Sequence, residues 1–151
     1  MLIRRAKLED LEKIVDFNIQ MAKETEERIL EKNVTRKGVK AVLNNESKGF
    51  FLLAEENKGE NEICGQLMIT YEWSDWRNKN FWWIQSVFVD KNYRNRKVFS
   101  KLFKFVTKMA LSEKEVGGLR LYVEKHNDSA KQVYESLGMK KTPYEIYEKW
   151  L

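Results

Sequence analysis

Apolar residues recur along this chain with two periods, and together these predict alternating strands and helices. Short runs that are apolar or alternate in polarity indicate strands, whereas apolar residues three or four positions apart indicate helices with one buried face. The run at 81–89 is apolar on both faces, as is typical of a strand inside a sheet. The predicted strands are residues 2–6, 50–55, 63–72, 81–89, 119–123 and 145–150. The predicted helices are residues 9–23, one or two short helices up to about residue 45, a helix between residues 97 and 117, and residues 128–137.

This order of elements predicts an α/β fold with a mixed central sheet and helices on both faces. A chain of 151 residues is long enough for one continuous hydrophobic core, and no stretch is rich in Gly, Ser or Pro like a linker. We therefore expect a single domain that spans residues 1–151.

Local signals refine the element boundaries. Gly117 and Gly118 would break the helix that follows residue 97, Gly138 would stop the last helix, and the polar segment 57–61 would be a turn. The helix after residue 97 would bury the apolar positions on its inward face. These are Val98, Leu102, Phe105, Val106 and Met109.

The scarcity of certain residue types excludes several classes of protein. With His126 as the only histidine and Cys64 as the only cysteine, the chain has too few ligands for a His-based metal site, and we expect no metal. Cys64 lies in an apolar run and reads as a small core residue. The absence of glycine from 66 to 116 removes the phosphate-binding loops that depend on glycine. Without a signal peptide or a membrane-length apolar run, we expect a cytoplasmic protein with no membrane partner.

The net charge of +5 is divided unevenly along the chain. Residues 9–31 hold eight acids against three basic residues, whereas residues 91–112 hold seven basic residues and no acid. Such a basic segment indicates nucleic-acid binding, a site for a small phosphate compound, or merely a solvated face. Arg94, Arg96 and Lys97 crowd one turn before a helix, where free N–H groups and the helix dipole favour an anion. We therefore prefer the small phosphate site.

A second segment, residues 121–139, places Asn127 at a strand-to-helix junction and Tyr134 within the helix. The structural alternative is that Asp128 caps this helix and that Tyr134 is a half-buried core aromatic.

Taken together, Val87-Phe-Val-Asp-Lys-Asn-Tyr-Arg-Asn-Arg-Lys-Val-Phe and Asn127-Asp-Ser-Ala-Lys-Gln-Val-Tyr-Glu-Ser-Leu-Gly-Met resemble the GNAT superfamily of acetyl-CoA-dependent N-acetyltransferases. The N-terminal Ile3-Arg-Arg-Ala and Glu9-Asp-Leu also look like the first strand and helix of this superfamily. The resemblance covers essentially the whole chain, and it implies an acyltransferase with acetyl-CoA as co-substrate.

The resemblance also implies roles for individual residues. Asn127 would bond the pantetheine or a site water, and Tyr134 would protonate the departing CoA thiolate. A backbone N–H near Val87 would polarise the thioester carbonyl. The strand that pairs with the pantetheine comprises Val87, Phe88 and Val89, and the turn that holds the pyrophosphate comprises Arg94, Asn95, Arg96, Lys97, Val98, Phe99 and Ser100.

The chain departs from the superfamily pattern in this turn. The pattern is Gln/Arg-x-x-Gly-x-Gly/Ala, so Arg94 fits its first position, while Lys97 and Phe99 stand at the two positions of small residues. Glycine there lets the backbone approach phosphate closely. We expect the two large side chains to reshape the grip without abolishing it, provided that both residues are helical with side chains turned away.

The acceptor is expected to be a small-molecule or peptide amine. Trp73 and Trp76 would line its pocket and attract a cation, with negative charge from Glu24 and Glu26; the alternative is an exposed hairpin and a solvated helix end. By the resemblance, Gln85 stands at the strand position where polyamine-acetylating relatives have a glutamate that acts as a base. A glutamine cannot accept a proton, so here it would only orient substrate or water. The general base, if one is needed, is unassigned: Glu26 is our choice and a water-mediated path is the alternative. The amine would attack directly without an acyl-enzyme.

Three functions remain: an active N-acetyltransferase, a non-catalytic acyl-CoA sensor, and a nucleic-acid binder that uses the basic segment. We favour the first and expect no nucleic-acid partner. Family habit also makes a homodimer a possible assembly.

Overall fold

A computed structural model of the chain describes residues 1–58 and 60–151, so the predicted turn at 57–61 lies partly outside the described residues. The described chain forms two compact units, residues 1–121 and residues 122–151. The strands are β1 (Leu2–Arg5), β2 (Phe50–Lys58), β3 (Glu60–Ser74), β4 (Lys79–Val89) and β5 (Val116–Arg120). The helices are η1 (Leu8–Asp10), α1 (Leu11–Glu26), α2 (Lys32–Leu43), η2 (Lys91–Tyr93), α3 (Val98–Ser112) and α4 (Asp128–Ser136).

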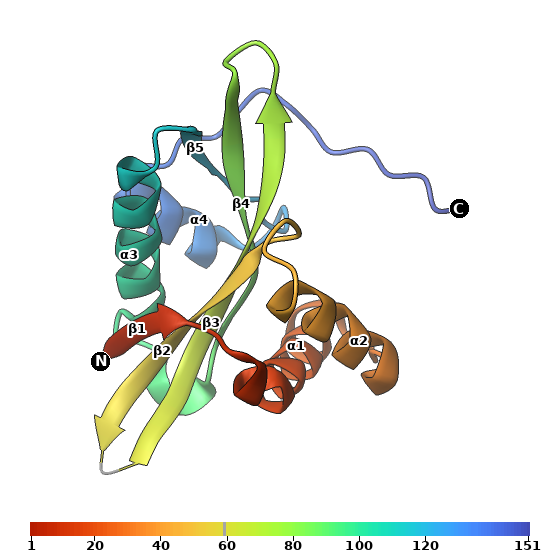
Figure 1. The fold of residues 1–151 in the computed structure, drawn as a ribbon, viewed down its shortest axis with the longest axis vertical. Helices are drawn as coiled ribbons and strands as arrows, with labels where there is room; N and C mark the ends of the chain where they lie inside the picture. The colour runs from red at the N-terminus through yellow and green to blue at the C-terminus, as the bar shows by residue number, and fades with distance from the viewer. Residues whose placement is uncertain (59) are drawn as a thin grey trace. The chain divides into compact units, whose positions relative to one another are not determined.

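The first unit is built on one mixed sheet with the strand order β1-β2-β3-β4-β5 (Figure 1). Neighbouring strands from β1 to β4 are antiparallel, and β5 runs parallel to β4. The parallel pairing requires a crossover, which α3 supplies between β4 and β5. The predicted mixed α/β sheet is therefore confirmed.

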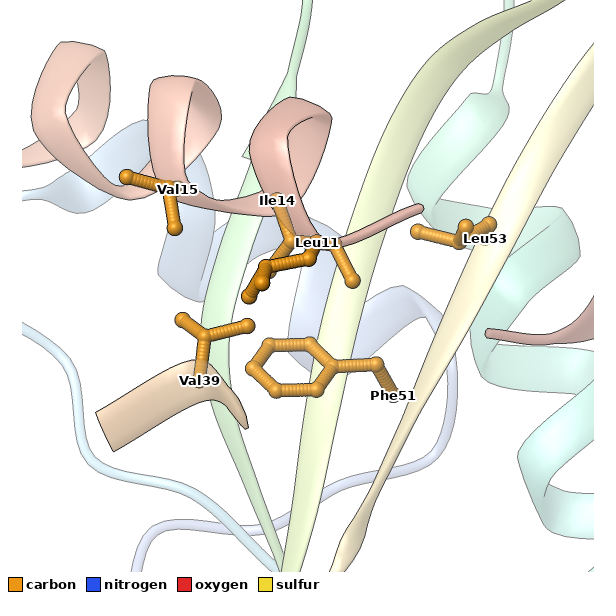
Figure 2. Packing of buried hydrophobic residues seen from close by; sticks show 6 residues of the cluster. All are labelled: Leu11, Ile14, Val15, Val39, Phe51 and Leu53. Atoms are coloured by element: carbon orange, nitrogen blue, oxygen red, sulfur yellow. The ribbon is translucent and has the colours of Figure 1, made fainter. Parts of the chain in front are cut away.

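Helices cover both faces of this sheet, as predicted. Phe51 and Leu53 alternate along β2 and point toward α1 and α2. The resulting core cluster comprises Leu11, Ile14, Val15, Val39, Phe51 and Leu53 (Figure 2). On the opposite face, a Cβ on Gly65 of β3 would come within 2.9 Å of the Val98 side chain, so α3 begins directly against this face.

Two boundaries in the α3–β5 region differ from the sequence prediction. Helix α3 already ends at Ser112, and Gly117 and Gly118 lie inside β5 rather than breaking the helix, so the strand is 116–120 and not 119–123. A Cβ on Gly118 would come within 2.9 Å of the Phe81 ring. The two glycines therefore serve the close approach of β5 to β4.

The buried face of α3 also differs in part. Val98, Leu102 and Val106 are buried as predicted, but Phe103 and Ala110 complete the face in place of Phe105 and Met109. The helix lies rotated toward Phe103 because its contacts extend across β1 to β5, which a helical period cannot reveal.

In the second unit, α4 ends as predicted at Gly138, whose positive φ of 87° provides the left-handed residue of a helix stop. The predicted strand 145–150 does not form, because no strand among the described residues pairs with this segment. The large apolar side chains of this segment and of the residues on either side of it are exposed instead. These are Tyr144, Ile146, Tyr147, Trp150 and Leu151.

Across the described residues, none of the helices combines the length and the apolar character needed to cross a membrane. Cys64 is fully buried in β3 and its Sγ donates to the backbone oxygen of Ala54 at 3.3 Å, which agrees with the core role predicted for it.

A compact charge cluster ties β1 to its neighbours. The Arg4 guanidinium donates to both carboxylate oxygens of Asp10 at 2.8 Å and, through Nε, to Glu55 at 2.6 Å. Both acids are buried. Burial by itself raises the pKa of Asp10, but hydrogen bonds from Arg4 and from the Lys7 amide outweigh it, so the pKa lies below its ordinary value.

The first prediction concerns Asp10→Asn. The change leaves Arg4 with one carboxylate partner, and we expect it to lower the free energy of unfolding by about 2 kcal/mol at pH 7. Because the folded pKa of Asp10 is depressed, its contribution is complete above the ordinary value near 4 and is lost as pH falls below it. Urea unfolding at pH 7 and at pH 3 should therefore show a gap to wild type that narrows in acid. An undiminished gap at pH 3 would contradict the assignment.

Candidate functional site

The ladder between β3 and β4 is interrupted near the middle of β4. Gln66 pairs with Phe88, but Met68 pairs with Gln85, so β4 carries one residue more than β3 over this stretch. This is a β-bulge, and Ser86 within it has a φ of 49°. Non-glycine residues rarely adopt this left-handed conformation. The bulge removes backbone groups at Ser86 and Val87 from regular pairing with β3.

Beyond the bulge, the last residues of β4 are held by contacts with α1. Phe88 is buried, and its ring lies 4.9 Å from that of Phe17 in α1. Val87 and Val89 are half-buried. The three residues predicted to pair with a pantetheine therefore lie together where β4 leaves the regular ladder.

The basic turn that follows β4 has the backbone geometry of an open helix start. Asn95 and Lys97 both have left-handed φ angles, 63° and 59°. Helix α3 begins at Val98, and within the described residues no side chain caps it. The first N–H that bonds back is that of Lys101, to the Lys97 oxygen at 3.0 Å. The N–H groups before it lie in the first turn, ahead of the helical hydrogen bonds, and such a helix start can hold an anion.

The two large residues at the small-residue positions behave differently from each other. Phe99 lies in the first turn of α3, with its ring 6.0 Å from that of Phe103 on the same helix. Lys97 is exposed, but its left-handed backbone is not the helical geometry that the sequence analysis required. The turn thus takes a glycine-like conformation at Lys97 without a glycine.

Side chains of the turn connect it to α1. Arg94 forms an ion pair with Glu24 at 2.5 Å, and its Nε donates to the Val89 oxygen at 3.1 Å. Arg96 stacks on Tyr93, with 5.1 Å between the guanidinium carbon and the ring centroid. Glu24, predicted on the acceptor side, therefore lies beside the basic turn. Glu26 is exposed near the end of α1.

A group of polar side chains lies on the same face of the sheet between the bulge and the β3–β4 hairpin, in the part of β4 that precedes Ser86. Gln85 donates to the Thr70 hydroxyl at 2.5 Å. Farther along, Glu72 accepts a hydrogen bond from the indole of Trp83 and another from Arg120 at 2.6 Å. Glu72 and Arg120 carry no motif, and the sequence analysis missed them because only the β3–β4–β5 register brings them together.

The structure does not bring Trp73 and Trp76 to the bulge. Trp73 pairs with Asn80, six residues before Ser86, which corresponds to about 20 Å along the strand. Trp76 lies in the hairpin turn and is 87% exposed. This geometry matches the alternative of an exposed hairpin tip.

In the second unit, Asn127 rather than Asp128 caps α4. The Asn127 side-chain oxygen accepts from the Ala130 amide at 3.1 Å, while Asp128 pairs with Lys131 at 3.0 Å. The structural alternative that assigned the cap to Asp128 is therefore wrong. Tyr134 is half-buried, and burial raises the pKa of its phenol above the ordinary value.

Comparison with a family model gives a match over residues 9–139, and the family is described as the acetyltransferase (GNAT) family. No curated protein matches the chain.

Solved structures resemble the chain over its whole length. A possible acetyltransferase from Clostridium difficile 630 is 45% identical, with a TM-score of 0.92 over 99% of this chain and 97% of that one. A probable acetyltransferase has 21% identity and a TM-score of 0.87 over 100% and 98% of the two chains. A ribosomal-protein-alanine N-acetyltransferase from Brucella melitensis biovar Abortus 2308 has 12% identity and a TM-score of 0.78 over 100% of both. The last two similarities show the fold alone.

The second prediction concerns the left-handed residue of the turn. A non-glycine residue in this conformation is strained by about 1 kcal/mol or more, while glycine adds flexibility to the unfolded chain. We expect Lys97→Gly to raise the free energy of unfolding by about 0.5 kcal/mol. The matched control is Arg96→Gly, since Arg96 has a negative φ; it should lower stability by about 0.5–1 kcal/mol. Denaturant unfolding compares the two, and equal losses would contradict the strained geometry.

Proposed function

This chain belongs to the GNAT acetyltransferase family, and we propose that it transfers an acetyl group from acetyl-CoA to a primary amine. One observation carries the proposal: an uncapped helix start with three basic residues directly follows a strand whose ladder is broken by a bulge. The first feature fits a pyrophosphate, and the second fits an extended pantetheine arm and its thioester.

Different residues of the first unit would bind different parts of acetyl-CoA. Backbone N–H groups of the turn from Arg94 to Ser100 would bond the pyrophosphate, with added charge from Arg96 and Lys97. Arg94 would exchange its ion pair with Glu24 for the phosphate. The backbone of Val87 to Val89 would pair with the pantetheine, and the Val87 N–H would polarise the thioester carbonyl.

The reaction is a direct displacement. The neutral amine attacks the acetyl carbon, the C–N bond forms, and the C–S bond breaks to release the CoA thiolate. Tyr134 donates its proton to that thiolate; a phenol with a raised pKa stays protonated until this step. Asn127 would bond the pantetheine or a site water through its amide N–H groups, since its oxygen is used in the cap.

On the acceptor side, the amine must lose a proton. Gln85 lies just before the bulge and would orient the amine or a water rather than accept the proton. Glu26 or a water-mediated path would take it. The acceptor itself is proposed to be a small-molecule or peptide amine. Its outer part would contact Trp73 and Trp76 only if it extended along the hairpin.

The third prediction tests the reaction. Acetyl-CoA with a panel of polyamines, amino acids, aminoglycosides and short peptides should release CoA thiol with at least one acceptor. Tyr134→Phe should lower kcat about 100-fold with a small change in the KM for acetyl-CoA, because the thiolate then leaves without a proton donor. Tyr147→Phe is the matched control, since Tyr147 is exposed in the C-terminal segment. Acetyl-CoA that binds without turnover on any amine would support the sensor instead.

The fourth prediction tests the pyrophosphate site. Acetyl-pantetheine lacks the pyrophosphate, so it should have a much higher KM than acetyl-CoA. Arg96→Ala should raise the KM for acetyl-CoA about tenfold and leave that for acetyl-pantetheine unchanged. Lys108→Ala, on an exposed position of α3, serves as the charge control. If Arg96→Ala raised the KM for acetyl-CoA and for acetyl-pantetheine equally, the Arg96 charge would not act on the pyrophosphate.

A further inference from the structure

Gln66 is an unusual residue for its position in the sheet. It is 0% exposed and lies in β3, between Leu53 of β2 and Phe88 of β4. Among the side chains of the first unit that the structure describes, the other buried polar ones are Asp10 and Glu55, and both are ionic partners of Arg4. Gln66 has no such partner, and it lies on the face covered by α1, among apolar neighbours.

The amide of Gln66 bridges α1 and the bulge. Its Nε2 donates to the Asn18 side-chain oxygen at 2.7 Å and to the Ser86 backbone oxygen at 3.3 Å. Both hydrogens of the amide are thereby used. The orientation is fixed, because a flipped amide would turn its oxygen toward the Ser86 oxygen, which cannot donate.

The other end of the amide has no partner. Within the described part of the chain, Gln66 Oε1 is buried and accepts no hydrogen bond. A buried acceptor without a donor lowers stability, and an apolar side chain of similar size would avoid that loss. The stability of the core therefore does not explain a glutamine here, whereas its contact with the bulge does.

The bulge needs a partner of this kind. Ser86 lies outside the regular ladder, so its carbonyl requires a donor from elsewhere, and its left-handed φ is strained for serine. The Gln66 amide supplies the donor, and Asn18 holds the amide from the helix side. Together they fix the backbone one residue before Val87.

We propose that Gln66 is a positioning residue: by holding the Ser86 carbonyl it keeps the bulge in the conformation in which the Val87 N–H faces the thioester carbonyl. The inference rests on the proposed acetyl transfer, and it adds a residue that never touches the substrate. Small displacements of such a hydrogen-bond donor lower rates strongly while substrate binding changes little.

The test uses Gln66→Met, which keeps an unbranched side chain of similar length but has no amide. It removes a buried acceptor without a donor, but it also takes the amide donor away from the Ser86 backbone oxygen and from the Asn18 side-chain oxygen. We therefore expect a melting temperature within about 3 °C of wild type. We expect kcat to fall about 10–100-fold and the KM for acetyl-CoA to change less than about threefold.

Rescue separates positioning from simple damage. Glycine adopts the left-handed φ without strain. Adding Ser86→Gly to Gln66→Met should therefore reverse at least about a third of the decrease in log kcat that Gln66→Met causes. Leu53→Met is the matched control, since Leu53 is a buried cross-strand neighbour of Gln66 in β2, on the side of β3 away from β4. It should leave kcat unchanged.

A readout without turnover separates this inference from the proposed function. Phe88 pairs with Gln66 beyond the bulge, and the Asp90 N–H donates to the Cys64 oxygen at 3.0 Å. Amide hydrogen exchange at Phe88 and Asp90 in the free protein should quicken at least about tenfold in Gln66→Met and remain unchanged in Leu53→Met. If wild type acetylates no amine yet exchange quickens, the proposed function fails and the clamp on the bulge stands. Unchanged exchange, an unchanged kcat, or a kcat loss that Ser86→Gly does not reduce would overturn the inference.

Discussion

The β-bulge at Ser86 is the constraint on which the rest of the first unit depends. Side chains alternate along a strand, so Gln85 and Phe88, three residues apart, would face opposite sides of a regular β4. The extra residue lets both face the α1 side, where Gln85 bonds Thr70 and Phe88 packs on Phe17. Because of the bulge, the same face of β4 carries Phe88 in the core under α1 and the polar side chain of Gln85 nearer the hairpin.

Charge separation along the chain has a counterpart in space. The acidic segment 9–31 contains α1, and the basic segment 91–112 contains the turn before α3. The two meet where Glu24 pairs with Arg94 at 2.5 Å, the side chains being about half-exposed. An exposed pair of this kind contributes little to stability. The pair holds Arg94 beside the uncapped start of α3. An anion of higher charge than Glu24, bound at this helix start, could replace Glu24 as the partner of Arg94.

Much of the fold follows from local patterns, and the exceptions have physical causes. Strands β2 to β4 and helix α1 follow apolar periodicity, because each buries one face or two against a neighbour. The segment 145–150 contains Ile146, Tyr147 and Trp150, residue types that favour strands, but among the described residues no strand pairs with it. The glycines of β5 look like a helix stop in the sequence. Only the approach of Phe81 to Gly118 shows that they serve strand packing.

The residues of the candidate site also fall into those that local sequence patterns predict and those that only the fold brings together. The basic turn and the α4 segment are contiguous motifs, so their residues could be named from the sequence. Gln66, Asn18 and Ser86 are far apart in the chain, and Ser86 adopts a left-handed φ without being glycine, so no pattern reveals the bulge. Trp73 and Trp76 suggested a pocket by composition. The β3–β4 register instead places them at the tip of a hairpin.

The buried cysteine has a practical consequence. Cys64 is the only thiol of the chain, it is inaccessible, and burial raises its pKa, so little of it is thiolate at neutral pH. Maleimides and other alkylating probes should therefore leave the native protein unmodified. A single cysteine introduced on the surface would then be the sole point of attachment for a fluorophore or spin label, and no cysteine-free background would have to be made first.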